Sequence, residues 1–473
     1  MSRSGIGLML LLIPAAALCA PPPLAPMSPT RPWPLPDATA AGRSSQISPS
    51  LAPYDLPGLI DLAQRINPET RQAWDEARVA AAGAGIARSA YLPQLAVEAL
   101  AGVQHTPLPA PATVVPRGYF VSDTREFIPS LTVKWLLFDF GRRDAARERA
   151  DAMVFVANAA FTGAHQTLVF TVTRDYYALR AAQGKERAAQ KGLETATIEQ
   201  RAVAERRKHE LATVVEVARA DRQVAQARLA LVRTSAARTV ALAALIADIG
   251  LPPDTALNLA SGDMGLPLPP ASNVARYVDE ALAKRPDLLA AQGKLDAAEA
   301  SVRAAEADDR PTVSLLGQAF LNNGRLRSDG GVWSSVHRPG GALFVQFSWP
   351  LFDGGLRRAS RLGAEATRDA AQDSLEALRR KAGKQVSDAF HALETSLAEV
   401  ESAHAVTLAA TVSHDAALSA YRHGLATFDE LAAEGSALAA AEADEEDARA
   451  KAFSSAASLA LATGKESSDP GVP

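Results

Sequence analysis

The chain has 473 residues, enough for several ordinary domains, and a formal net charge of −4 with 22% charged residues of both signs. This balance excludes the strongly basic composition of a nucleic-acid-binding protein. Aromatic residues make up only 5% of the sequence, which is low for a compact enzyme core, and alanine is abundant, which favours closely packed helices.

The N-terminus has the pattern of a secretory signal peptide over residues 1–19. Arg3 gives a positive start, residues 7–17 form an apolar run, and small residues near Ala20 offer a cleavage site. The run is far shorter than the roughly 20 residues of a membrane-spanning helix, and no later stretch is expected to be apolar enough to span a membrane as a helix. The protein is therefore predicted to leave the cytoplasm without a helical anchor.

Cys19 is the single cysteine, so neither an intramolecular disulfide nor a cysteine metal site can form. Its place after the apolar run allows two interpretations: an acylated lipoprotein cysteine, or a passive residue at an ordinary cleavage site. Leu18 stands where a lipoprotein site usually has a small residue. Residues 20–53 are proline-rich and are predicted to form an extended tether or surface strap.

The remaining chain contains two sequence repeats. Trp135 and the motif Leu137-Phe138-Asp139-Phe140-Gly141 return as Trp349 and Leu351-Phe352-Asp353-Gly354-Gly355, at an offset of 214 residues (349 − 135). The repeats are assigned to residues 54–250 and 274–464, with a proline-rich connector over 251–273. Residues 465–473 are expected to be a disordered tail.

The first repeat is predicted to contain two helical segments, two strands and a long helical hairpin. In chain order these are a helix over 56–88 that restarts at Asn67-Pro68, strands over 95–103 and 131–137 separated by a loop over 105–126, and helices from 141 to about 208 and over 214–249. The longer helix would have about 65 residues and a length of about 100 Å. A helix of this length needs a coiled-coil-like partner.

The second repeat follows the same order. Helix is predicted over 274–308, a strand over 313–321, a glycine-rich loop over 322–341, a strand over 343–351, and two long helices that end near Tyr421 and Gly464.

Each strand has an apolar and a polar face. Four strands cannot close a membrane barrel, because the smallest ones have about eight, but three chains would supply twelve. Trp135 and Trp349 are predicted to lie at the membrane interface; the alternative is a soluble sandwich with both tryptophans in its core.

This plan resembles the TolC-like outer membrane factors of Gram-negative bacteria over residues 54–464, as do the two motifs above and Tyr421-Arg422-His423-Gly424-Leu425. The resemblance implies a fold that is mainly α with a transmembrane β part, assembled as a homotrimer with a twelve-stranded β-barrel and a twelve-helix periplasmic α-barrel. The implied partners are outer-membrane lipid, a periplasmic adaptor protein and an inner-membrane transporter. Residues 117–120 and 135–146 look especially like members associated with resistance to fusaric acid or other aromatic acids.

The resemblance also implies a periplasmic tip at the two helix turns. The implied adaptor-docking residues are Leu211, Ala212, Thr213, Gly424, Leu425, Ala426 and Thr427, and the alternative is an ordinary helix turn. The implied gate residues are Tyr421, Glu216 and Glu430, although a Glu430 that simply faces solvent fits the sequence equally well. Glu210, Ala426 and Ala433 stand where members usually have glycine, arginine and an acidic residue, so the closed gate is expected to be built differently.

No catalytic motif, cofactor motif or metal-binding histidine pair is recognisable. The chain is therefore predicted to be no enzyme, to bind no nucleic acid, and to form a passive outer-membrane exit channel for small toxic compounds such as drugs or aromatic acids. Two alternatives remain open. One is the outer-membrane channel of a type I protein secretion system, and the other is a soluble periplasmic coiled-coil protein.

Overall fold

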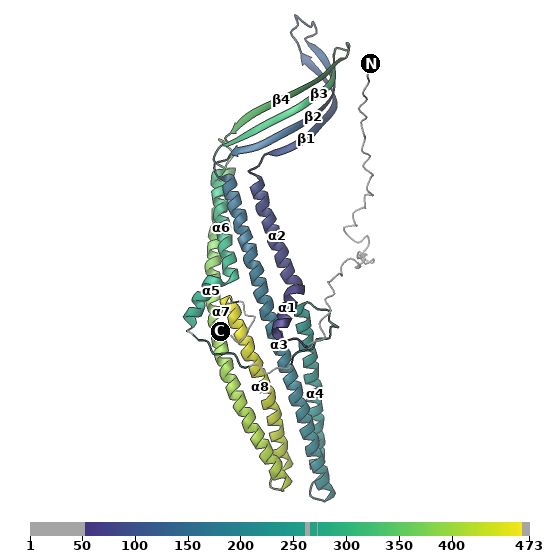
Figure 1. Ribbon diagram of the computed structural model, residues 1–473, viewed down its shortest axis with the longest axis vertical. Coiled ribbons are helices and arrows are strands. Elements are labelled where there is room, and N and C mark those ends of the chain that lie inside the picture. The colour runs from purple at the N-terminus through teal and green to yellow at the C-terminus, as the bar shows by residue number, and fades with distance from the viewer. Residues whose placement is uncertain (1–52, 261–264, 272, 466–473) are drawn as a thin grey trace. The chain divides into compact units, whose positions relative to one another are not determined.

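The structure is a computed structural model that describes residues 53–260, 265–271 and 273–465 (Figure 1). The predicted signal peptide, Cys19, all but the last residue of the proline-rich tether and the tail beyond Lys465 lie outside the described residues.

The described elements form two series with the same order. The first is α1 (Leu56–Ile66), α2 (Pro68–Ser89), β1 (Gln94–Pro109), β2 (Tyr119–Phe138), α3 (Arg142–Lys208) and α4 (Val214–Ile249); the second is α5 (Val274–Lys284), α6 (Pro286–Ala307), β3 (Thr312–Ser328), β4 (Ser334–Ser348), α7 (Leu356–Arg422) and α8 (Phe428–Thr463). Corresponding helices have 11, 22, 67 and 36 residues in both series. The fold therefore confirms the duplicated plan, mainly α with four strands.

Both β-hairpins are longer than the sequence pattern predicts. The pattern places loops over 105–126 and 322–341, but the residues between the strands are only 110–118 and 329–333. In the added strand segments polar side chains occupy both faces, so the alternation that identifies a strand is absent. Pro107 and Pro109 lie on β1, whose second edge has no partner strand in the described part of the chain, and an edge strand tolerates proline because its outward N–H groups need no ladder partner.

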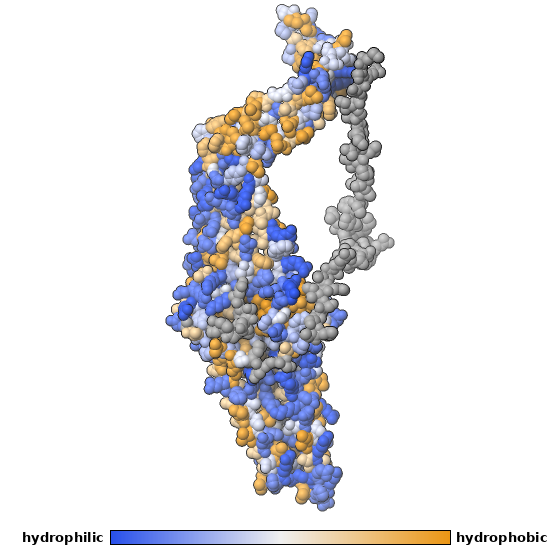
Figure 2. Space-filling model, viewed as in Figure 1, coloured by the Kyte–Doolittle hydropathy of each residue, from blue (hydrophilic) through white to orange (hydrophobic). Residues whose placement is uncertain are grey.

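The four strands form one antiparallel sheet in the order β1-β2-β3-β4. Its register collects apolar side chains on one face. The cross-strand rows of that face are Leu95–Val133–Gly317–Leu343, Val97–Leu131–Ala319–Gly341 and Trp135–Leu315–Val345. Val97 is 82% exposed and Val345 is 67% exposed, and Figure 2 shows apolar surface along the sheet. A continuous exposed apolar face of this kind needs a partner other than water.

The strand-to-helix junction is built identically in both repeats. The Asp139 carboxylate accepts hydrogen bonds from the backbone N–H and Nε of Arg143 (2.8 and 3.1 Å), and Asp353 accepts the same pair from Arg357 (3.2 and 2.6 Å). Gly141 has φ +103° and Gly355 has φ +94°, a region that side chains with a Cβ rarely adopt. The repeated motifs are therefore turn motifs that start the 67-residue helices.

The long helices pack side by side in a layer. Among the described residues α3 packs on α4 and α8, and α8 packs on α7, while nearer the sheet α2 packs on α3, and α6 packs between α3 and α7 (Figure 1). The outer helices α4 and α7 leave apolar side chains exposed, among them Val232, Val240 and Val412. These faces are available to further helices.

One expectation about membrane helices is wrong. Both α3 and α4 contain an 18-residue stretch that is long and apolar enough, by composition alone, to cross a membrane. The stretches arise because alanine, valine and leucine fill both the packed and the outward faces of these helices. In α4 the outward face carries Leu229, Val232 and Val240.

Each return helix ends against the start of an earlier helix. At the end of α4, Asn67 Nδ2 donates a hydrogen bond to the Asp248 carbonyl (2.9 Å), and at the end of α8, Arg285 Nη1 donates to the Ala462 carbonyl (3.3 Å). Gly250 and Gly464 close these helices in the left-handed conformation. The positive end of one helix dipole thus faces the negative end of another, which stabilises both helices.

The glycine that closes α8 gives a test of this stacking. Gly464 and Gly424 both have φ +75°, but a Cβ at Gly464 would lie 3.1 Å from backbone atoms of Lys284 and Arg285, whereas a Cβ at Gly424 would meet nothing within 4 Å. Gly424→Ala should cost about 1–2 kcal/mol from the backbone conformation alone. Gly464→Ala should cost about 1–3 kcal/mol more, because the backbone must shift. Urea unfolding of the two variants measures the difference, and equal losses would contradict the stacked junction.

Candidate functional site

The two helix turns, α3–α4 and α7–α8, have the same geometry. Glu210 and Gly424, which are equivalent in the repeats, both adopt the left-handed conformation with φ +62° and +75°. Thr213 and Thr427 then cap the return helices, and in each case a glutamate three residues later completes a capping box. Glutamate is unfavourable in this conformation where glycine is not, so the first turn holds a strained backbone that the second avoids.

The predicted docking residues divide into three roles. Leu211 is 66% exposed and Leu425 is 83% exposed, so each turn presents one leucine to its surroundings. Ala212 is buried and Ala426 is half-buried, while the two threonines bind the helix starts. The repeated Leu-Ala-Thr sequence therefore places one apolar side chain outside each turn and holds the turn with the other two residues.

Two of the predicted gate residues serve as helix caps. Glu216 Oε2 accepts a hydrogen bond from the Thr213 backbone N–H (2.6 Å), and Glu430 Oε2 accepts one from Thr427 (2.8 Å). These contacts satisfy backbone donors that a helix start otherwise leaves free. The carboxylates are thus engaged within their own turns.

The third predicted gate residue lies in a small core between the two hairpins. Tyr421 is 1% exposed and packs with Val203 of α3 and Phe428 of α8. The Arg206 guanidinium lies 4.8 Å from the tyrosine ring centroid, and its Nη1 donates to the Tyr421 carbonyl (2.7 Å). Burial raises the pKa of the Tyr421 hydroxyl above its usual value, and its Oη has no hydrogen-bond partner within the described residues.

Polar side chains outside this core also join the hairpins. Arg219 of α4 forms an ion pair with Asp429 of α8, and Gln223 Nε2 donates to Ser436 Oγ (3.1 Å). Sequence reasoning missed Arg206 and Arg219, although the repeat comparison contains a signal for the second. Arg219 corresponds to Ala433, and Asp429 corresponds to Val215. Opposite charges at positions where the other repeat is apolar indicate a contact specific to the two hairpins.

A buried contact between a glutamate and a histidine lies further from the turns. His414 Nε2 of α7 lies 3.4 Å from Glu199 Oε1 of α3, and Glu199 is only 2% exposed. A Cβ on Gly435 of α8 would lie 3.4 Å from the same carboxylate oxygen, so three helices meet here. Burial raises the pKa of Glu199, and its hydrogen bond to His414 opposes this shift.

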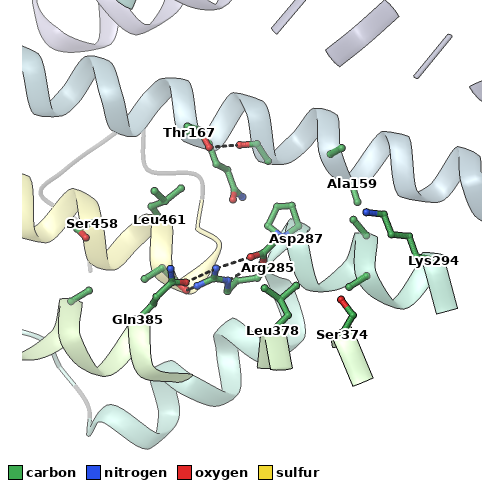
Figure 3. A pocket seen from close by; sticks show the side chains of 18 of the residues that line it. Ala159, Thr167, Arg285, Asp287, Lys294, Ser374, Leu378, Gln385, Ser458 and Leu461 are labelled. Atoms are coloured by element: carbon green, nitrogen blue, oxygen red, sulfur yellow. Dashed lines mark hydrogen bonds and ion pairs between the residues drawn. The ribbon is translucent and has the colours of Figure 1, made fainter. Parts of the chain in front are cut away.

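A cavity lies away from the turns, between α3, α6, α7 and α8. It has a volume of about 900 Å³ and a lining rich in alanine. Arg285 forms an ion pair with Asp287 (2.7 Å) and donates to Gln385 (2.9 Å) at its wall (Figure 3). The described residues contain no group of three or more histidine, cysteine, aspartate or glutamate residues that could hold a metal ion.

Comparisons with known proteins agree with this architecture. The family model for outer membrane efflux proteins matches residues 59–251 and 277–465, one match for each repeat. The chain is 30% identical to protein CyaE of Bordetella pertussis over 342 residues, which is 72% of this chain and 69% of CyaE.

Solved structures show the same fold. The chain superposes on the outer-membrane channel OprN with a TM-score of 0.74 at 24% identity, covering 87% of this chain and 90% of OprN. It superposes on the outer membrane protein VceC from Vibrio cholerae with a TM-score of 0.72 at 21% identity, covering 87% of this chain and 96% of VceC.

The buried Glu199 predicts a pH-dependent stability difference. A carboxyl whose pKa is raised by folding stabilises the protein below its unfolded-state pKa, and this contribution is lost as the pH rises through the folded-state value. Wild type should therefore lose stability relative to Glu199→Gln as the pH rises above about 4.3, the ordinary pKa of a glutamate. Urea midpoints measured at increasing pH test the sign. Glu401→Gln, an exposed position on α7, should show no such trend, and a flat difference for Glu199→Gln would contradict the assignment.

Proposed function

Because the chain belongs to the outer membrane efflux protein family, we propose that it is the exit channel of a tripartite efflux system, which expels small toxic compounds such as drugs or aromatic acids. The observation that carries this proposal is the sheet: one continuous apolar face, with one edge of β1 and one edge of β4 left without a partner strand among the described residues. A membrane tolerates such a sheet only as part of a closed barrel.

Closure by three copies fits both parts of the fold. Pairing of β4 with β1 of the next copy gives twelve strands in a trimer and removes every open edge. The strands have 15 to 20 residues, more than the ~9–11 that a tilted strand needs to cross the hydrocarbon core. The exposed apolar faces of α4 and α7 would meet in the same assembly and give a tunnel of twelve helices.

The tryptophans support the assignment of the membrane border. Trp135 Nε1 donates to the Tyr91 carbonyl (2.9 Å) and Trp349 Nε1 to the Asp309 carbonyl (3.1 Å). Both rings thus lie where the sheet meets the helices, with an apolar body and a satisfied polar group. Tryptophan with these properties is typical of membrane–water interfaces.

The helix turns would then form the periplasmic entrance. In this assignment Leu211 and Leu425 dock a periplasmic adaptor protein, which connects the channel to an inner-membrane transporter. The core around Tyr421 and the ion pair between Arg219 and Asp429 hold the two hairpins together in the closed state. Energy would come from the transporter, since passive flow through the duct needs no chemistry from this chain.

Cell fractionation followed by an unboiled gel and planar-bilayer recording tests the channel. We expect a heat-dissociable trimer in the outer membrane and channels of low conductance. A soluble monomer would contradict the barrel and favour a periplasmic coiled-coil protein.

Deletion of the gene separates efflux from protein secretion. A strain without the protein should become more sensitive to toxic small molecules while its secreted proteins are unchanged. Loss of a secreted protein with unchanged sensitivity would instead assign the channel to protein secretion.

The ion pair between the hairpins predicts a gating phenotype. Arg219→Ala removes the contact to Asp429, so the closed state should be less stable and the single-channel conductance should rise. Arg222→Ala, three residues further along α4 and also exposed, is the matched control and should behave as wild type. Unchanged conductance for both Arg219→Ala and Asp429→Asn would exclude this pair from the gate.

The exposed leucines predict a docking phenotype. Each leucine buried against an adaptor contributes about 1.5–3 kcal/mol, so Leu425→Asp should weaken co-purification of the cognate adaptor about tenfold or more. His209→Asp places the same charge on an exposed turn position without removing a leucine, and should leave co-purification unchanged. If Leu425→Asp and Leu211→Asp both retain the adaptor, docking uses another surface.

A further inference from the structure

An arginine cluster lies on the apolar side of the sheet, near the ends of the strands that are farthest from the helices. We propose that Arg125 of β2 and Arg325 of β3 bind the phosphate groups of an anionic amphiphilic lipid in the membrane around the barrel. The inference rests on the proposed function, because this face meets lipid only if the sheet forms a barrel.

The register places both arginines on the apolar face. Arg125 and Arg325 are directly opposite each other, in a row that begins with Val103 on β1. Phe127 lies two residues from Arg125 on the same face, and Leu131 continues that face along β2. Phe127 is half-exposed, and both arginines are exposed. Two cations therefore stand at the border of the surface that would be covered by acyl chains.

The charges of these two arginines are not balanced within the chain. Nearby Arg327 forms an ion pair with Asp123 (2.7 Å), and Arg117 forms one with Asp329. No carboxylate pairs with Arg125 or Arg325 in the described part of the structure. Like charges directly opposite one another destabilise a strand pair, so an anion that lies between the two guanidinium groups would remove this cost.

An aromatic ring holds part of the cluster. The guanidinium groups of Arg125 and Arg327 both lie 4.9 Å from the ring centroid of Trp333. Such contacts restrict the side chains and leave their outward N–H groups available. A planar guanidinium presents a fork of donors that matches phosphate oxygens.

The adjacent apolar surface favours a lipid over a soluble ion. Val103 and Phe127 lie beside the arginines on the same face and offer contact for an acyl chain. A charged side chain near the membrane border costs little compared with one at the midplane, and the border is where lipid phosphate groups lie. The chemistry that matches this surface is thus a phosphate carried on a hydrocarbon chain.

The test uses the detergent-purified trimer and three probes: dioleoyl phosphatidic acid, dioleoyl phosphatidylcholine and inorganic phosphate. Native mass spectrometry should show that wild type retains phosphatidic acid in preference to phosphatidylcholine. The double variant Arg125→Gln/Arg325→Gln should lose about tenfold or more of this affinity, as expected when charge-assisted hydrogen bonds are removed. Arg338→Gln is the matched control, because Arg338 pairs with Asn322 on the opposite face of the sheet.

The lysine variants keep the test informative if the glutamine variant does not assemble. Arg125→Lys/Arg325→Lys retains the charge but not the planar fork, so it should bind phosphatidic acid with intermediate affinity. Retention that is unchanged in both double variants, or equally reduced by Arg338→Gln, would overturn the proposal. Competition by inorganic phosphate at concentrations equal to those of the lipid would assign an ion site instead. Failure to obtain any membrane-inserted trimer would contradict the channel itself rather than this site.

Discussion

An amphipathic sheet with two open edges is the constraint on which the rest of the structure depends. Its apolar face spans all four strands, so the sheet is unsuited to water, and its free edge groups are unsuited to hydrocarbon. Only closure with further strands satisfies both conditions. The helices also need further copies of the chain, because the outer helices α4 and α7 leave apolar side chains exposed in a single chain.

Because of the duplication, each chain supplies two copies of the same unit, a strand hairpin followed by a long helical hairpin. The positions at which the two repeats differ identify contacts that only one repeat makes. The junctions that set helix direction are identical, as Asp139–Arg143 and Asp353–Arg357 show. The stacked junctions differ in detail, since Asn67 supplies a neutral donor where Arg285 supplies a charged one. Close to the turns the repeats diverge further, and Arg219 of one repeat binds Asp429 of the other. Residues that the repeats share thus build the strand-to-helix junctions, and residues that differ between the repeats join the two helical hairpins.

The sequence predicts the helices well and the strands and tip contacts less well. Helix ends are visible because caps, glycines and proline-free blocks define them locally, as at Val214 and Gly464. Strand ends are hidden where both faces are polar, as near Arg325. The tip residues Glu216 and Glu430 are recognisable by position, but their engagement in capping boxes depends on side-chain geometry. Glu199 and His414 are 215 residues apart (414 − 199), and no local pattern brings such a pair together.

In the proposed channel, the contacts at the tip would hold the closed state until docking changes them. The side chains of Arg219 and Asp429 are 43% and 57% exposed, and an exposed ion pair contributes only about 0.2–1 kcal/mol. A leucine buried against a partner contributes about 1.5–3 kcal/mol. The free energy gained by burying Leu211 and Leu425 would therefore exceed the free energy lost when the ion pair between Arg219 and Asp429 breaks. The core around Tyr421 is nearly fully buried and is more costly to open. A partner that binds these leucines more tightly in the open arrangement would break the peripheral ion pair first, and movement of the hairpins would be resisted chiefly by the Tyr421 core.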